Sequence, residues 1–289
     1  MKIVFTVATG NPRYVEQALG LARSLALVGD QTRRVVLSDS DDPRLRRWFS
    51  SVVRPRDDGL PYLHKVQALD LTDADEVLFL DSDCLAFGRL DRIWKASEGA
   101  GMAVQGNWIW DGHWYGWLEE LLPRWGLTRL PMFDGGMMYY RRCPETLATL
   151  AEVRRIAAEY DSMGLERFRG TIPDEPCVSI AMQRTGNCRL LPDNSAFIKS
   201  PTGVVGKLDV DVRRRRCRYV RHTRHGLTIV EPTILHAAKY VNNGIYWRQL
   251  SYLEKFERYE DAHPFGYMSP LHKLRRSMER RILKFAGKL

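Results

Sequence analysis

The chain has 289 residues, 44% of them hydrophobic, which is enough to bury a substantial core in one large domain or two closely packed halves. No window approaches 18 uninterrupted apolar residues and the five cysteines show no CxxC spacing, which argues against a membrane-spanning helix, a zinc knuckle and a disulfide framework. The formal net charge of +9 implies an anionic partner, and nucleotide phosphates, anionic lipid and nucleic acid all qualify on charge alone.

The first third of the chain alternates between strand and helix patterns. Strands are expected at residues 2–9, 33–39, 51–55 and 76–80, and helices at residues 14–27, 42–49 and 62–71. Asp42 and Pro43 suit the cap and first turn of the second helix. This order predicts an α/β fold with a mainly parallel sheet covered by helices on both faces, and ligands bind such sheets at the carboxyl ends of the strands. The N-terminal apolar run is too short for a secretory leader, so an unexported, cytoplasmic protein is expected.

The middle and last thirds of the chain are less regular. Residues 106–131 include a stretch with four tryptophans and no clear periodicity. Alternation returns at residues 135–142, and helices are expected from Pro144 toward Tyr160 and from near Glu175 onward. An alternating pattern on both sides of Gly226 predicts a β-hairpin.

Two carboxylates follow the strand expected at residues 76–80, because Asp81 and Asp83 stand one residue apart. On an extended segment both side chains point to the same side, where two oxygen ligands can bind Mg²⁺ or Mn²⁺ and leave positions open for diphosphate oxygens. The alternative is an Asx turn or a cap for a helix over residues 90–95. The pair alone does not decide between these interpretations, so its context matters.

Six motifs in one order resemble the nucleotide-sugar glycosyltransferases of the GT-A fold, particularly the retaining, glycogenin-like family 8 group. The motifs are FTVATGNPRYVEQALGLARSL, LHKVQAL, LDSDCLAFGRLDRIW, FDGGMMYYRR, IPDEPCVSIAM and ILHAAKY. The resemblance implies a GT-A (Rossmann-like) domain over residues 1–265. It also implies transfer of a hexose-type sugar from a UDP-sugar to a glycan or lipid-linked acceptor, with Mn²⁺ or Mg²⁺ as cofactor.

The same resemblance implies roles for individual residues. The implied metal ligands are Asp81, Asp83 and His236. The implied contacts to the nucleotide and its phosphates are Thr9, Tyr14, Lys65 and Lys239, and those to the donor sugar are Asp134, Gly135 and Gly136. The implied acids beside the reaction centre are Asp174 and Glu175. From the residue pattern alone, His236 also fits a buried core histidine, Tyr14 a contact that fixes the first helix, and Lys239 a surface lysine.

The chain departs from the family pattern at several of these positions. Asp134 replaces the usual asparagine, a Gly-Gly pair at residues 135–136 stands where Ser-Gly is usual, and Glu175 replaces the commoner glutamine. The spacing from His236 to Lys239 is short, and the Pro-Trp that usually follows is missing. A carboxylate at Glu175 can stabilise an oxocarbenium-like centre or attack it to give a covalent intermediate. A degenerate nucleotide-sugar-binding protein and a GT-A-like nucleotidyltransferase are the alternatives to a metal-dependent retaining transferase.

Two further stretches concern the acceptor. The sequence DVRRRRCRYVRHTRH fits either a solvated strand face or a surface that binds an anionic acceptor, and nucleic acid fits less well because no nucleic-acid-binding motif accompanies it. The tryptophan-rich stretch fits either a small hydrophobic core or an acceptor-side flap on which sugar rings stack.

The C-terminal segment, residues 266–289, predicts a basic amphipathic helix. Its apolar residues recur at steps of three and four: Leu271, Leu274, Met278, Ile282, Phe285 and Leu289. Seven lysines and arginines lie between them, with Glu279 the single acid from residue 269 onward. Such a helix suits the anionic cytosolic face of a membrane, and the alternative is a helix packed on its own domain or on a second copy.

Overall fold

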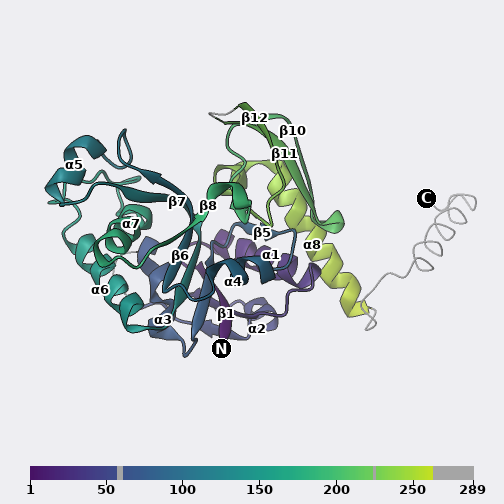
Figure 1. Cartoon of the computed structure of the whole chain (residues 1–289). Coiled ribbons are helices and arrows are strands. Elements are labelled where there is room, and N and C mark those ends of the chain that lie inside the picture. The colour runs from purple at the N-terminus through teal and green to yellow at the C-terminus, as the bar shows by residue number, and fades with distance from the viewer. Residues whose placement is uncertain (57–60, 224–225, 263–289) are drawn as a thin grey trace, which may run out of the picture.

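The structure is a computed structural model that describes residues 1–56, 61–223 and 226–262 of the chain. A seven-stranded sheet forms its centre (Figure 1). In order across the sheet, its strands are β3 (Ser51–Val53), β2 (Arg33–Ser38), β1 (Lys2–Ala8), β4 (Glu76–Leu80), β7 (Leu130–Arg141), β6 (Met102–Ile109) and β8 (Arg189–Pro192). Neighbouring strands are parallel except that β7 runs antiparallel to both β4 and β6. The predicted α/β class with a mixed, mainly parallel sheet is therefore confirmed.

Helices cover both faces of this sheet. One layer contains η1 (Pro61–Gln67), α3 (Ala68–Leu71), α5 (Leu118–Arg124), α6 (Pro144–Ala158) and α7 (Asp174–Thr185), and the other contains α1 (Pro12–Leu27), α2 (Pro43–Trp48) and α4 (Asp91–Ser97). Because side chains alternate along a strand, Ile3 and Phe5 of β1 reach the first layer and Val4 reaches the second. The strands are apolar on both faces for this reason.

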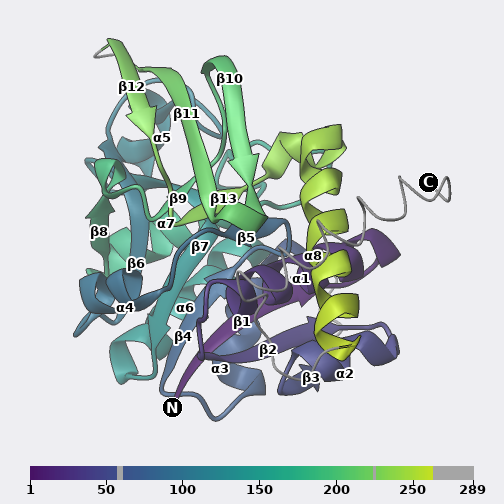
Figure 2. The same ribbon diagram turned by 90° about the vertical axis from the view of Figure 1, so that its right-hand side faces the viewer.

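Two small sheets complete the described fold. One consists of β5 (Cys84–Ala86), β13 (Ile234–His236) and β9 (Ile198–Lys199), and the other of β10 (Val204–Asp211), β11 (Arg216–Thr223) and β12 (Gly226–Val230). Three short 3₁₀ helices lie among these strands: η2 (Asp193–Ser195), η3 (Val212–Arg214) and η4 (Ala238–Asn242). The sheet β10–β11–β12 stands on the side of the molecule away from the N-terminus, and α8 (Gly244–Ala262) packs between that sheet and α1 (Figures 1 and 2).

Most elements lie where the sequence predicted them, including the capped helix α2, where the Asp42 side chain accepts the N–H of Arg44. The antiparallel pairing of β11 and β12 confirms the hairpin around Gly226. The segment 62–71 is mainly a 3₁₀ helix with one α-helical turn, and it places Lys65 beside Asp174. Residues 106–131 are more regular than predicted, because β6 extends to Ile109 and α5 begins at Leu118.

The predicted C-terminal amphipathic helix, residues 266–289, lies outside the described residues. Within the described ranges, no helix combines the length and the apolar character that crossing a membrane would need.

Candidate functional site

The two motif carboxylates lie in a turn at the carboxyl end of β4. The strand ends at Leu80, and the N–H of Cys84 donates to the carbonyl oxygen of Asp81 at 3.0 Å. The backbone from Asp81 to Asp83 therefore forms a turn. The prediction of an extended segment at these residues is wrong. The turn nevertheless presents both carboxylates to one neighbour, the imidazole of His236.

His236 reaches the turn from β13, which pairs with β5 so that His236 lies opposite Cys84. Its Nε2 lies 3.3 Å from Oδ1 of Asp83 and 3.5 Å from Oδ2 of Asp81. The three potential ligand atoms all lie within 4.8 Å of one another. Two carboxylate oxygens and one imidazole nitrogen suit Mn²⁺, and the oxygens also suit Mg²⁺. These residues therefore fit the divalent cation that the resemblance implies.

Asp134 holds the other ring nitrogen of His236. Its Oδ1 lies 2.5 Å from Nδ1 of His236 and also accepts the N–H of Gly136 at 3.0 Å. Its Oδ2 accepts the hydroxyl of Ser200 at 2.8 Å. A carboxylate behind a histidine fixes the ring with its free nitrogen toward the metal, as is usual around metal-binding histidines. Ser200, which no sequence pattern distinguishes, thus belongs to the site.

The pair of His236 and Asp134 is charged in the metal-free protein. Burial by itself lowers the pKa of His236, but Asp134 and Asp83 raise that pKa well above the ordinary value of 6.5. Burial raises the pKa of Asp134, but the charge of His236 and the hydrogen bonds to the carboxylate hold that pKa well below its ordinary value. A cation that takes Nε2 must therefore displace a proton.

The two glycines at residues 135–136 make room for the site on opposite sides of β7. A Cβ atom on Gly136 would lie 2.6 Å from Nδ1 of His236. A Cβ atom on Gly135 would lie 2.9 Å from Oε1 of Glu175. Because consecutive residues of a strand face opposite sides, Gly136 admits His236 and Gly135 admits Glu175. The steric demand is strictest at Gly136, where a Cβ would meet the imidazole ring, since the Glu175 side chain that faces Gly135 is flexible.

The predicted acids lie at the start of α7, where a helix favours negative charge. Oδ2 of Asp174 lies 3.0 Å from Nζ of Lys65, which also lies 3.4 Å from Oδ1 of Asp81. Oε1 of Glu175 accepts the N–H of Gly135 at 2.9 Å. Lys65 thus contacts two clusters. We call Asp81, Asp83 and His236 the metal group, and Asp174 and Glu175 the acid group.

Tyr115 occupies the remaining oxygen of Glu175, with its hydroxyl donating to Oε2 at 2.9 Å. The sequence selected the tryptophan-rich stretch that contains Tyr115 but not this side chain. The one sequence feature that could have identified Tyr115 is its position between Trp114 and Trp117, in a stretch already associated with the acceptor.

Burial is the main cause of the altered pKa values at the two acidic positions that titrate near neutrality. It raises the pKa of Glu175 to about 7, with Asp174 adding to the shift and Gly135, Lys65 and Tyr115 opposing it. It raises the pKa of Asp81 to about 6 against the charges of Lys65 and His236. Burial lowers the pKa of Lys65, but Asp174 and Asp81 outweigh burial and raise it, so this lysine stays charged. Groups with such values are typical of catalytic sites.

The remaining predicted contacts lie around this centre. Thr9 follows β1, and its hydroxyl lies 3.3 Å from Nδ1 of His64. Tyr14 lies in the first turn of α1 with 45% of its surface exposed. Lys239 lies in η4, which begins two residues after His236, the last residue of β13, and Oδ2 of Asp83 accepts the N–H of Ala238 at 2.9 Å.

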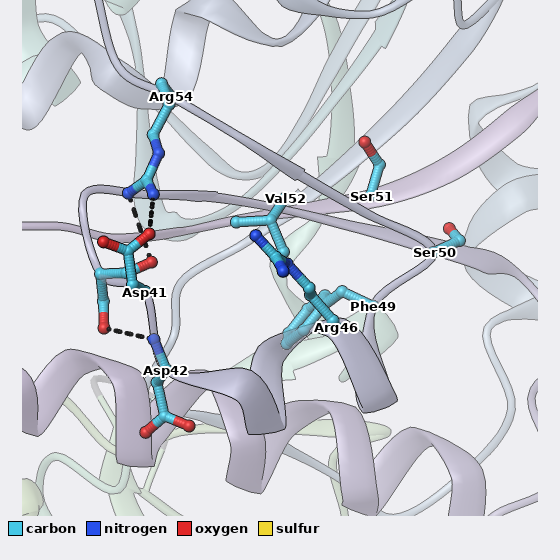
Figure 3. A pocket seen from close by; sticks show the side chains of 9 residues that line it. Asp41, Asp42, Arg46, Phe49, Ser50, Ser51, Val52 and Arg54 are labelled. Carbon is cyan, nitrogen blue, oxygen red and sulfur yellow. Dashed lines mark hydrogen bonds and ion pairs between the residues drawn. The ribbon is translucent and has the colours of Figure 1, made fainter.

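A separate hollow lies elsewhere on the described surface. It measures about 380 Å³ and is lined by residues 40–42, 46, 49–52 and 54, between α2 and β3. Figure 3 shows Arg54 reaching across it to Asp41. The metal group does not line this hollow, so it plays no part in the site described above.

The fold is the GT-A fold of nucleotide-sugar glycosyltransferases, as two solved structures show. The galactosyltransferase LgtC, in complex with donor and acceptor sugar analogs, has a TM-score of 0.51 and 16% identity, covering 70% of this chain and 77% of LgtC. The bifunctional glycosyltransferase WbbM has a TM-score of 0.50 and 13% identity, covering 82% of this chain and 45% of WbbM. No protein-family profile and no curated protein matches the chain.

Proposed function

We propose that this chain is a divalent-metal-dependent glycosyltransferase that retains the anomeric configuration and moves a hexose-type sugar from a UDP-sugar to a glycan or lipid-linked acceptor. The observation that carries the proposal is the convergence of Asp81, Asp83 and His236 at the carboxyl end of β4. Ligands of α/β sheets bind at this edge. The likeness to LgtC, a galactosyltransferase with donor and acceptor sugar analogs, supports the reaction class.

Asp81, Asp83 and His236 would hold Mn²⁺ or Mg²⁺, which stabilises the charge that grows on a departing nucleoside diphosphate. Tyr14 offers an exposed ring on which a base can stack. Thr9 and Lys239 flank the same edge of the sheet and are proposed as further contacts to the nucleotide and its phosphates.

Asp134, Gly135 and Gly136, the residues expected to contact the donor sugar, are proposed to have two different roles. The carboxylate of Asp134 is engaged with His236, so we assign it to orienting the metal ligand. The backbone of Gly135 and Gly136 passes between the metal group and the acid group, where it can line the donor sugar. Lys65 holds Asp81 and Asp174 at their places and remains charged.

Asp174 and Glu175 are proposed to lie beside the anomeric carbon. The bond from that carbon to the diphosphate oxygen breaks, and its electron pair leaves with the diphosphate. Glu175 then either stabilises the positive charge on the sugar ring or bonds to the carbon. The acceptor hydroxyl attacks that carbon from the face that the diphosphate left, the bond to Glu175 breaks where one has formed, and the hydroxyl proton passes to the departing diphosphate. Both routes lead to retention.

The acceptor side is assigned to the tryptophan-rich stretch. Trp110 and Trp117 have 59% and 57% of their surfaces exposed, which leaves aromatic faces for a sugar ring. Residues 266–289 are proposed to bind an anionic membrane surface and to bring the GT-A domain, residues 1–265, to a membrane-embedded acceptor from the cytosolic side.

A thermal-shift and hydrolysis screen of UDP-sugars and GDP-sugars, with and without Mn²⁺, tests the function. A donor that binds only the native state at a hundred times its Kd adds about 2.7 kcal/mol to the free energy of unfolding. We expect stabilisation by a UDP-sugar that requires Mn²⁺, and its loss in Asp83→Asn. Asp209→Asn, which removes an acid of β10 paired with Arg216, is the matched control and should behave as the wild type.

Each failure has a separate meaning. Full Mn²⁺-dependent stabilisation of Asp83→Asn would remove the metal assignment. Binding without any donor hydrolysis or transfer would favour the degenerate nucleotide-sugar binder. An inverted anomer in the NMR spectrum of the product would contradict the retaining mechanism.

A further inference from the structure

Tyr115 links the tryptophan-rich loop to the acid of the reaction centre. Its hydroxyl donates to Oε2 of Glu175 at 2.9 Å, while Oε1 of Glu175 accepts the N–H of Gly135 at 2.9 Å. Each carboxylate oxygen therefore has one fixed donor, one from β7 and one from the loop. A carboxylate held at both oxygens has a defined orientation.

The backbone of Tyr115 adopts a conformation that L-residues rarely adopt, with φ at +55°. Hydrogen bonds on both sides hold it there. The carbonyl oxygen of Tyr115 accepts the N–H of Glu166 at 3.0 Å, and the N–H of Trp114 donates to the carbonyl oxygen of Gly116 at 2.9 Å. Strained residues of this kind cluster at functional sites, where the surrounding structure over-determines them.

The same loop carries the exposed aromatic surface proposed to receive the acceptor. Trp110 and Trp117 are both more than half exposed, and the ring of His113 lies edge-on to Trp117 at 5.2 Å between centroids. His113 Nε2 also lies 2.9 Å from Oε1 of Glu166, the residue whose N–H holds Tyr115. A ligand on Trp117 thus lies two residues from the side chain that orients Glu175.

We propose that Tyr115 is a positioning residue that holds Glu175 in its reactive orientation and makes that orientation depend on the loop that binds the acceptor sugar. The role of Glu175 in sugar transfer rests on the proposed function, whereas the hydrogen bond between Tyr115 and Glu175 does not. The charged and titratable groups that act on Glu175 are Asp174 on α7, Lys65 on η1 and Tyr115 on the loop. Of these, Tyr115 alone belongs to the loop.

Tyr115→Phe removes the hydroxyl and keeps the ring. A hydrogen bond to the ionised carboxylate favours the charged form, so its loss should raise the pKa of Glu175 above its present value of about 7, by roughly one unit. Infrared difference titration of the full chain measures this, with the band of protonated Glu175 assigned by its absence in Glu175→Gln. The kcat should fall at least about tenfold with the donor KM unchanged, and the acid limb of the kcat/KM profile should move to higher pH.

Tyr139→Phe is the matched control, because the hydroxyl of Tyr139 donates to Oε2 of Glu76 at 2.8 Å at the opposite end of β4. It removes an equivalent tyrosine–glutamate hydrogen bond and should leave the titration of Glu175 and the kcat unchanged. A Glu175 midpoint in Tyr115→Phe equal to that of the wild type would overturn the proposal. If the wild type transfers no sugar, the proposed function fails, while the infrared titration still decides whether Tyr115 controls Glu175.

Discussion

Asp134→Asn tests whether the carboxylate behind His236 strengthens the metal site. Asparagine has the same shape, so its oxygen can still accept from Nδ1 of His236 and from Gly136, and its amide can donate to the hydroxyl of Ser200. The substitution therefore preserves the geometry and removes the negative charge. Loss of such a partner typically lowers metal affinity about 10- to 100-fold, which corresponds to about 1.4–2.7 kcal/mol. The 2.5 Å contact between His236 and Asp134 and the low exposure of their side chains, 13% and 26%, place this site toward the upper end.

Isothermal titration with Mn²⁺ alone, carried out over a range of pH, measures the affinity for the deprotonated ring of His236 without any sugar donor. This range is needed because Asp134→Asn should also lower the pKa of His236 and so reduce the competition from its proton. Asp209→Asn changes the net charge equally at a site away from the metal group and should bind Mn²⁺ within about twofold of the wild type. Equal affinities of Asp134→Asn and the wild type would refute the reasoning, because the carboxylate would then contribute nothing through the histidine. A circular-dichroism melt of each variant confirms that the comparison is made on folded protein.

Two further predictions concern the same histidine. Gly136→Ala should reduce Mn²⁺ affinity at least about tenfold, since the new methyl group would displace the ring of His236, whereas Gly88→Ala meets Thr233 at an ordinary 3.5 Å and should bind as the wild type does. Mn²⁺ binding near neutral pH should release about one proton, because the pKa of His236 is raised and the ring must give up the proton on Nε2. Calorimetric titrations in buffers of different ionisation enthalpy measure the number of protons released. The Mn²⁺ affinity should rise by up to about tenfold per pH unit. A Mn²⁺ affinity that does not change with pH would contradict the predicted proton release.

The sequence predicted the parts of the site that lie close together along the chain. The apolar run at residues 76–80 identifies a strand end from local pattern alone, whereas Asp81 and Asp83 were assigned to a cation site only together with the resemblance. The order of strands and helices predicted the sheet, since periodicity reports which faces are buried. His236 was selected through the resemblance and not through its own pattern.

Contacts between distant residues were not accessible in this way. Asp134 and His236 are 102 residues apart, and Ser200 joins them from a third segment. Tyr115 lies in a stretch without periodicity, and its partner Glu175 is 60 residues away. Such pairings depend on how sheets and loops are brought together, which hydrophobic periodicity does not encode.

An excess of negative charge at this centre favours binding of a cation. Five carboxylates and two cationic side chains gather there, so the fully ionised group carries an excess of three negative charges: Asp81, Asp83, Asp134, Asp174 and Glu175 against Lys65 and His236. Burial of so many acids raises the pKa of Asp81 to about 6 and that of Glu175 to about 7. A divalent ion offsets two of the negative charges beside Asp81.

Strand β7 divides this charge into two halves. Gly136 faces the metal half through His236, and Gly135 faces the acid half through Glu175. Lys65 contacts both halves, at Asp81 on one side and Asp174 on the other. Asp134→Asn is expected to act first on the metal half and Tyr115→Phe on the acid half. Lys65 is the residue through which a change in one half reaches the other.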